Sequence, residues 1–368
     1  MSENKIKIGI TQGDTNGIGY EVILKALEDP RMVELCTPII YGSAKIAGFY
    51  RKQCALPQYQ IVQIQNASQA HPDQVNIINV VDEQVKIEPG NPSREAGRAA
   101  FAALEAAVTD LRSGEIDALV TAPIDKATIQ SSEFQFPGHT EYLEASLGEQ
   151  GVDHALMILA TDRMRVALVT THLSISSIAS AITKENVLAK IRAFETALES
   201  DFAIRHPRIA VLSLNPHAGE EGLLGTEESE QIKPAIEEAQ AAKVNCFGPY
   251  AADGFFGSGL WKKFDGILAM YHDQGLAPFK TLAMDCGVNV TSGLPFIRTS
   301  PDHGTGYDIA GQGKASEQSM RDAIYMAIDI WRARRSHAEA LRNPLKKQYV
   351  ERNKKDNVVL DLSKSSDE

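Results

Sequence analysis

The chain has few cysteines, no long apolar run and no excess of basic residues. The four cysteines are scattered and form no Cys-x-x-Cys pair, at Cys36, Cys54, Cys246 and Cys286. We therefore expect free thiols, as in a cytoplasmic protein. No apolar segment is long enough to span a bilayer, and the first residues lead directly into a strand-like segment, so we expect neither a membrane anchor nor a signal peptide. The formal net charge of -11 argues against general binding of nucleic acids.

What remains is the composition of a soluble globular enzyme, with 43% hydrophobic and 23% charged residues. A chain of 368 residues is long enough for two domains. Short apolar runs alternate with amphipathic segments, which predicts an α/β fold with mostly parallel sheets. The predicted strands cover 5–10, 38–41, 61–64, 76–80, 118–120, 155–159, 166–170, 209–212 and 266–270. The predicted helices cover 17–27, 44–52, 93–112 (with Ser93 as N-cap), 184–203, 227–241 and 318–335.

Three histidines, His172, His217 and His272, follow or adjoin apolar runs that resemble buried strands. Ligands collect where strands end in α/β proteins. A single histidine is more often a hydrogen-bonded structural residue, but three in the same context favour a site for zinc or another divalent cation. Three protein ligands would leave one coordination position open for a substrate.

A second set of polar residues is suited to an anion. Lys280, Asn289 and Arg298 follow one another in largely apolar segments, and an arginine can bind a phosphate through two hydrogen bonds. The alternative is a group of surface charges paired with local acids. The segments between these residues are apolar and would be buried, which favours the anion site.

Two glycine-rich segments remain. The segment 302–313 (DHGTGYDIAGQG) has the composition of a loop whose backbone closely approaches a ligand, although it lacks the G-x-G-x-x-G fingerprint. The segment 13–19 (GDTNGIG) superficially resembles a nucleotide loop, and tight packing between a strand and a helix explains it equally well. Asp14 either caps this turn or reaches the active site.

Taken together, these segments resemble the 4-hydroxythreonine-4-phosphate dehydrogenase family of vitamin B6 biosynthesis. The resemblance covers about residues 5–335 and includes the strings GDTNGIGYE, GHTEYL, LNPHAGEEGLLGTEE, YHDQGLAPFK and VNVTSGLPFIRTSPDHGTGYDIAG. It implies two α/β/α domains with a cleft between them, as in isocitrate and isopropylmalate dehydrogenases and unlike Rossmann enzymes. It also implies a homodimer whose active site lies near the subunit boundary.

The resemblance implies a role for individual residues. The metal ligands would be His172, His217 and His272. Substrate contacts would come from His139, Thr140, Lys280, Asn289 and Arg298. The dinucleotide would lie near His303, Gly304, Thr305, Asp308 and Gly311. One domain would comprise 1–128 with 296–345 and carry the dinucleotide loop, the other would comprise 129–295 and carry the metal ligands and dimer contacts, and 346–368 would form a tail.

The implied reaction is the oxidation of 4-phosphooxy-L-threonine at C3 with NAD or NADP, followed by decarboxylation to 3-amino-2-oxopropyl phosphate. One divalent metal per subunit, zinc, cobalt or magnesium, would assist. Lys126 and Asp253 are candidate general bases, and a structural ion pair explains each equally well. Departures from the usual family strings, such as Thr15-Asn16 in place of proline and alanine, leave the small phosphorylated substrate open between this compound and D-threonate or D-erythronate 4-phosphate. A metal-dependent phosphate-ester hydrolase and a binding-only protein are the remote alternatives.

Overall fold

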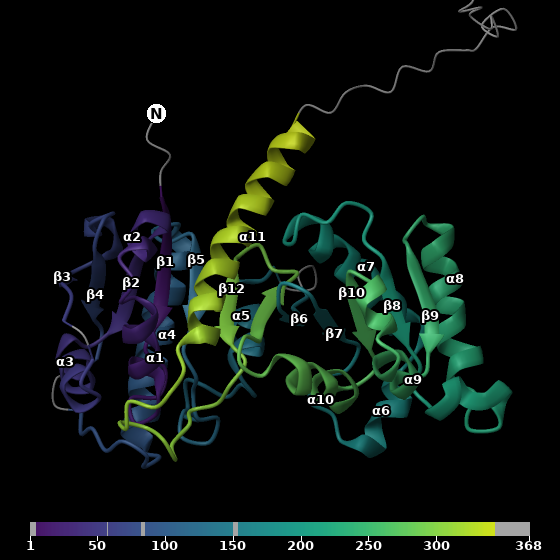
Figure 1. Ribbon diagram of the computed structural model, residues 1–368, viewed down its shortest axis with the longest axis horizontal. Helices are drawn as coiled ribbons and strands as arrows, with labels where there is room; N and C mark the ends of the chain where they lie inside the picture. The colour runs from purple at the N-terminus through teal and green to yellow at the C-terminus, as the bar shows by residue number, and fades with distance from the viewer. Residues whose placement is uncertain (1–4, 57, 82–84, 150–153, 343–368) are drawn as a thin grey trace, which may run out of the picture.

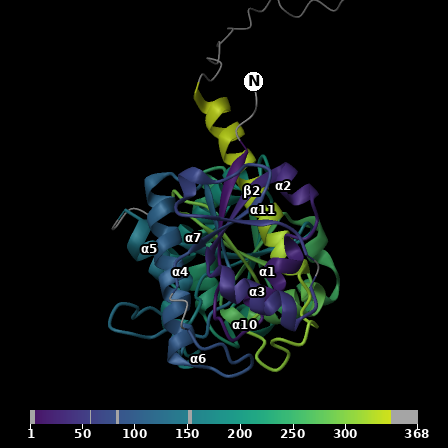
Figure 2. The same ribbon diagram turned by 90° about the vertical axis from the view of Figure 1, so that its left-hand side faces the viewer.

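The computed structural model describes residues 5–56, 58–81, 85–149 and 154–342. The described strands form one long twisted sheet with helices on both faces (Figures 1 and 2). The strand order is β3-β4-β2-β1-β5-β12-β11-β6-β7-β10-β8-β9. This arrangement confirms the predicted α/β class.

Six strands of the first half of the sheet pair in parallel. They are β3 (Ile61–Ile64), β4 (Val75–Asn79), β2 (Cys36–Gly42), β1 (Ile6–Thr11), β5 (Ala118–Thr121) and β12 (Arg298–Pro301). The last of these comes from a distant part of the chain and lies beside β5, with Arg298 paired to Leu119. The chain therefore crosses back from the second half of the sheet to the first half at β12.

The middle of the sheet is antiparallel. There β12 pairs with β11 (Val288–Ser292), β11 with β6 (Leu156–Ala160), and β6 with β7 (Arg165–Leu168), all antiparallel. Beyond β7 the pairing becomes parallel again, through β10, β8 and β9, which span Gly266–Ala269, Ile209–Leu212 and Cys246–Tyr250. Most pairings are thus parallel, as predicted, and the exceptions cluster at the centre.

Alternating side chains attach the sheet to its two helical layers. In the fully buried strand β2, Ile40 belongs to one apolar cluster while Ile39 and Tyr41 belong to another on the opposite face. The first layer contains α1 (Gly19–Ala26), α2 (Arg31–Leu35), α3 (Ala44–Gln53), α6 (Ile175–Ala181), α7 (Lys184–Ser200), α8 (Lys233–Ala241) and α11 (Gln318–Arg342). The second contains α4 (Arg94–Ser113), α5 (His139–Leu147), α9 (Ala252–Gly257) and α10 (His272–Ala283). Figure 2 shows α4 and α5 on one side of the sheet and α1 and α11 on the other.

Local signals explain several of the element boundaries. Ser93 caps α4 by accepting a hydrogen bond from the backbone N–H of Ala96, and Gly114 ends it with a φ of 78°. The predicted strands 61–64 and 209–212 match β3 and β8. Helix α11 continues to Arg342 rather than ending at Arg335, and its end projects beyond the body of the protein (Figure 1).

Other features differ from the predictions or stay open. The sequence predictions omitted three strands and five helices: β9, β11, β12, α2, α5, α6, α9 and α10. The two-domain division stays a prediction; the predicted tail 346–368, like 343–345, lies outside the described residues. Among the described helices, none combines the length and apolar content needed to cross a membrane.

Candidate active site

Two cavities of about 250 and 190 Å³ share one set of polar walls. The shared residues are Lys126, His139, Lys280, Asn289, Arg298 and Asp302. The first cavity also reaches His303 and Gly304, and the second reaches Thr140, His172 and His272. The five residues predicted to bind the substrate therefore share one site with two of those predicted to bind the dinucleotide and two of the three predicted to bind the metal.

Arg298 is a buried cation in this site. Thr121 Oγ1 accepts hydrogen bonds from its Nε and Nη2 atoms at 3.1 and 2.7 Å, and Thr291 Oγ1 accepts one from Nη1 at 3.2 Å. Within the described residues, no carboxylate hydrogen bonds to the guanidinium. Burial lowers the pKa of Arg298 to about 10, and Glu141 partly opposes the shift. A buried cation held only by hydroxyl groups is stabilised by an anionic ligand.

Other polar atoms of the same walls also lack partners. His139 Nε2 and Asn289 Oδ1 are buried without a hydrogen bond. Burial, with Arg298 and Lys126 nearby, holds the pKa of His139 well below its usual range, so the ring is neutral. Unpaired buried polar atoms are costly, so their clustering in one cavity points to a polar ligand.

His172 and His272 face the second cavity from different elements. Their ring centroids are 6.0 Å apart. Glu141 Oε1 lies 3.5 Å from Nδ1 of His172, and Asp273 Oδ1 lies 2.7 Å from Nδ1 of His272. Carboxylates that orient one ring nitrogen and leave the other available are typical of metal-binding histidines.

His217 lies apart from the other two histidines in the folded chain. It is not among the residues that line the cavity of His172 and His272, and the described residues contain no group of three His, Cys, Asp or Glu side chains placed to hold one ion. His217 begins a left-handed turn over 217–221, with φ between 44 and 78°. Buried Glu228 holds the base of this turn, since its carboxylate accepts hydrogen bonds from the backbone N–H groups of Leu214 and Asn215.

The loop 303–313 rests on the first glycine-rich loop. Thr305 O accepts a hydrogen bond from the backbone N–H of Ile18, and a Cβ on Gly17 would lie only 2.8 Å from that oxygen. Asp14 accepts hydrogen bonds from Tyr307 Oη and from the backbone N–H of Asn16. The glycines of 13–19 thus serve close packing, and Asp14 both caps its turn and fastens the second loop.

The other residues predicted for the dinucleotide site and the two candidate general bases lie in different surroundings. Gly311 has a φ of 73° and packs against Pro89, and the side chain of Asp308 is exposed. Of the candidate bases, Lys126 lines both cavities, whereas Asp253 is exposed on α9 and lines neither. The sequence predictions overlooked the roles of Thr121, Thr291, Glu141 and Asp302. The position of Glu141 in the GHTE string was the available signal for that residue.

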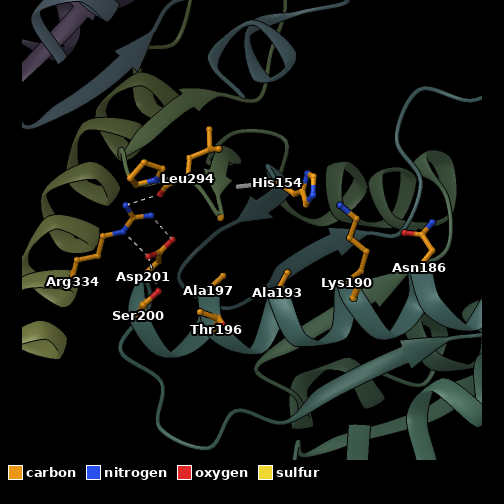
Figure 3. A pocket seen from close by; sticks show the side chains of 13 residues that line it. His154, Asn186, Lys190, Ala193, Thr196, Ala197, Ser200, Asp201, Leu294 and Arg334 are labelled. Atoms are coloured by element: carbon orange, nitrogen blue, oxygen red, sulfur yellow. Dashed lines mark hydrogen bonds and ion pairs between the residues drawn. The ribbon is translucent and has the colours of Figure 1, made fainter. Parts of the chain in front are cut away.

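A larger cavity, of about 670 Å³, lies between α7 and residues 293–295 (Figure 3). None of the predicted site residues lines it. It is therefore a separate feature from the active site.

Comparison with known proteins places the chain in a family. Residues 34–327 match the model of the pyridoxal phosphate biosynthetic protein PdxA. The chain belongs to the PdxA family. A protein from Bacteroides thetaiotaomicron named 4-hydroxythreonine-4-phosphate dehydrogenase is 58% identical over 362 residues, which cover 98% of this chain and 99% of that protein.

Solved and curated relatives agree with this membership. The crystal structure of 4-hydroxythreonine-4-phosphate dehydrogenase from Klebsiella pneumoniae has a TM-score of 0.77 and 34% identity, and the match covers 90% of this chain and 99% of that one. A Cutibacterium acnes protein whose name provisionally assigns it to D-threonate 4-phosphate is 38% identical, over 88% of this chain and 94% of that protein. The PdxA family is a family of dehydrogenases, which implies a nicotinamide cofactor and a small phosphorylated substrate.

Proposed function

We propose that the protein oxidises 4-phosphooxy-L-threonine at C3 with NAD or NADP and releases CO2 and 3-amino-2-oxopropyl phosphate. The observation that carries this proposal is the buried guanidinium of Arg298, which lacks an anionic partner among the described residues and lines both cavities. A phosphate would supply that charge. The names of the relatives support this substrate class.

The phosphate would lie against Arg298, Lys280 and Asn289. Such anchoring at one end of a four-carbon substrate fixes the distance of C3 from the dinucleotide. The neutral ring of His139 and the hydroxyl of Thr140 would hydrogen bond to the substrate's head group. The dinucleotide would lie along 303–313, near His303, Gly304, Thr305, Asp308 and Gly311.

His172 and His272 fit a divalent metal, because each has one ring nitrogen engaged by a carboxylate and the other available. The third ligand would be His217 of a second copy of this chain, since His217 does not line the same cavity. Such sharing makes the homodimer part of the active site. Bound zinc, cobalt or magnesium would supply Lewis acidity toward the C3 hydroxyl and the neighbouring amino group.

In the reaction, the C3 hydroxyl loses its proton and C3 passes a hydride to the nicotinamide. Lys126, at the cavity wall, is the candidate proton acceptor on this chain. The product is a 3-oxo acid, and its carboxylate, β to the new ketone, leaves as CO2. The carbon that loses CO2 then takes up a proton.

The proposal is tested with the purified full chain, NAD or NADP, and a panel of 4-phosphooxy-L-threonine, D-threonate 4-phosphate and D-erythronate 4-phosphate. We expect reduced nicotinamide to appear with the first compound and to disappear after dialysis against a chelator. Highest kcat/KM with D-threonate 4-phosphate would instead favour the substrate in the name of the Cutibacterium acnes relative. Release of inorganic phosphate without nicotinamide reduction would indicate a hydrolase and overturn the proposal.

A further inference from the structure

Asp302 is a carboxylate in the active site for which neither the sequence predictions nor the proposed reaction has a use. It directly follows β12, its side chain is 14% exposed, and it lines both cavities. The other carboxylate among the described cavity residues, Glu141, lines only the second cavity, where it lies 3.5 Å from Nδ1 of His172. Asp302 therefore offers a negative charge to whatever occupies the site.

Without a ligand, the carboxylate of Asp302 is only weakly paired. Its ion pair with Lys280 Nζ spans 3.4 Å, which is long for a hydrogen bond. Burial raises the pKa of Asp302, and Lys280, His303 and His272 act in the opposite direction. Asn289 Oδ1, a second acceptor in both cavities, has no donor. These two acceptors lie in the same walls as the cations Lys126, Lys280 and Arg298, which indicates that the ligand carries hydrogen-bond donors as well as a phosphate.

The surroundings of Asp302 locate these donors on the substrate. Lys280, proposed to hold the phosphate, and His272 and His303, proposed to lie near the metal and the dinucleotide, all act on this carboxylate, and Lys280 lines both cavities with it. On a four-carbon substrate anchored at its phosphate by Lys280, C2 and C3 would lie toward His272 and His303 and so within reach of Asp302. The substituent at C2 is an amino group in 4-phosphooxy-L-threonine and a hydroxyl in the threonate and erythronate phosphates.

We propose that Asp302 accepts a hydrogen bond from the C2 amino group and so makes the enzyme prefer an amino-acid phosphate over a hydroxy-acid phosphate. This inference rests on the proposed function. A carboxylate is an acceptor only, and an amino group keeps N–H bonds to donate whether it is protonated or bound to a metal. A hydroxyl offers a single donor and no charge, so it compensates the buried carboxylate less well.

The test compares Asp302→Asn with the wild type, using the full chain and the three phosphorylated acids of the panel. We expect kcat/KM for 4-phosphooxy-L-threonine to fall about 10- to 100-fold, the range for loss of a hydrogen bond to a charged group. The values for the two hydroxy acids, or their inhibition constants where turnover is absent, should change by less than about threefold. Asp302→Glu, which keeps the charge, should recover part of the preference and shows that the position tolerates substitution.

Lys280→Met tests whether Asp302 recognises the C2 amino group directly or only affects binding through its ion pair with Lys280. All three compounds carry the phosphate, so losing Lys280 should weaken all of them alike. Asp162→Asn, at a carboxylate that is 80% exposed, is the matched surface control and should change nothing. Equal losses for amino and hydroxy acids in Asp302→Asn, or no loss, would overturn the inference.

Calorimetric titration with the same three compounds measures the preference as a ratio of dissociation constants, without turnover. Wild-type protein that neither binds nor oxidises any of them contradicts the proposed function and the inference together. Wild-type protein that binds them with a ratio unchanged by Asp302→Asn contradicts only the role of Asp302.

Discussion

The hydroxyl of Tyr307 donates a hydrogen bond to Asp14 Oδ2 at 3.0 Å, although the two residues are 293 positions apart. Asp14 is buried, and burial raises its pKa. The bond joins the loop after the first strand to the loop proposed to hold the dinucleotide. The first glycine-rich segment therefore acts as a platform for the second loop.

Replacing Tyr307 with phenylalanine should weaken dinucleotide binding. The change removes one hydrogen bond to a buried carboxylate, worth about 1.5–3 kcal/mol, and frees the loop at one point. We expect KM for the dinucleotide to rise about tenfold, with little change in KM for the phosphorylated substrate. Tyr59→Phe is a suitable control, because the Tyr59 hydroxyl bonds to Leu24 O, away from both cavities. An unchanged dinucleotide KM in Tyr307→Phe would show that this bond does not position the loop.

Arg298→Lys should raise KM for the phosphorylated substrate about 10- to 100-fold. Lysine keeps the charge but cannot reproduce the planar fork that bonds to Thr121 and Thr291. Thr121→Val should act in the same direction, since it removes the acceptor for Nε and Nη2, whereas Thr121→Ser keeps that acceptor and should remain near wild type. Steady-state kinetics with saturating dinucleotide measure the effect. Wild-type KM in Arg298→Lys would remove Arg298 from phosphate binding.

The neutral ring of His139 should make stability depend on pH. The pKa of this histidine is held well below 6.5 in the folded protein, whereas the unfolded chain takes up the proton near that value. The unfolded state therefore binds more protons below about pH 6.5, and stability falls as the pH falls. His139→Gln should reduce this loss by up to about 1.4 kcal/mol per pH unit. Urea unfolding at pH 8 and near pH 5.5 gives the free energy of unfolding of wild type and His139→Gln at each pH. The same loss of stability between the two pH values in both proteins would contradict the role assigned to the ring.

The α/β class could be predicted because most strands are short apolar runs that alternate with amphipathic helices. Strands β11 and β12 escaped prediction because their sequences, VNVTS and RTSP, contain too few consecutive apolar residues. Helices α5 and α10 begin without a side-chain cap, and α10 contains Gly275 and Pro278, which are weak helix formers. Their starting signals are therefore absent from the sequence.

The candidate site, like the fold, could be predicted only in part from the sequence. Sequence strings identified His139, Lys280 and Arg298, which the structure brings to the same cavities. The support of Arg298 by Thr121 and Thr291 depends on the order β5-β12-β11, which arises from long-range pairing. No local pattern specifies that order. The separation of His217 from the other two histidines likewise depends on where its turn lies in the folded chain.

Asp201 and Arg334 fasten α11 to the second half of the protein and should contribute strongly to stability. Their two hydrogen bonds, Nε to Oδ1 at 2.7 Å and Nη2 to Oδ2 at 3.0 Å, lie at the end of the large cavity (Figure 3). The carboxylate is 2% exposed and also accepts a hydrogen bond from Ser292, while Arg334 Nη1 donates to the carbonyl oxygens of Leu294 and Phe296.

Asp201→Asn leaves the partly buried guanidinium of Arg334 without its counter-charge, so we expect the free energy of unfolding to fall by about 3 kcal/mol. Asp329→Asn is the matched control on α11, because its pair with Arg332 spans 3.8 Å at the surface, and it should cost at most about 1 kcal/mol. Urea unfolding of both variants, with Arg334→Met and the double variant to complete a cycle, measures the coupling. Because none of the predicted site residues lines this cavity, kcat of folded Asp201→Asn should stay near wild type. Equal losses of stability in Asp201→Asn and Asp329→Asn would show that the pair of Asp201 with Arg334 contributes no more than an exposed pair.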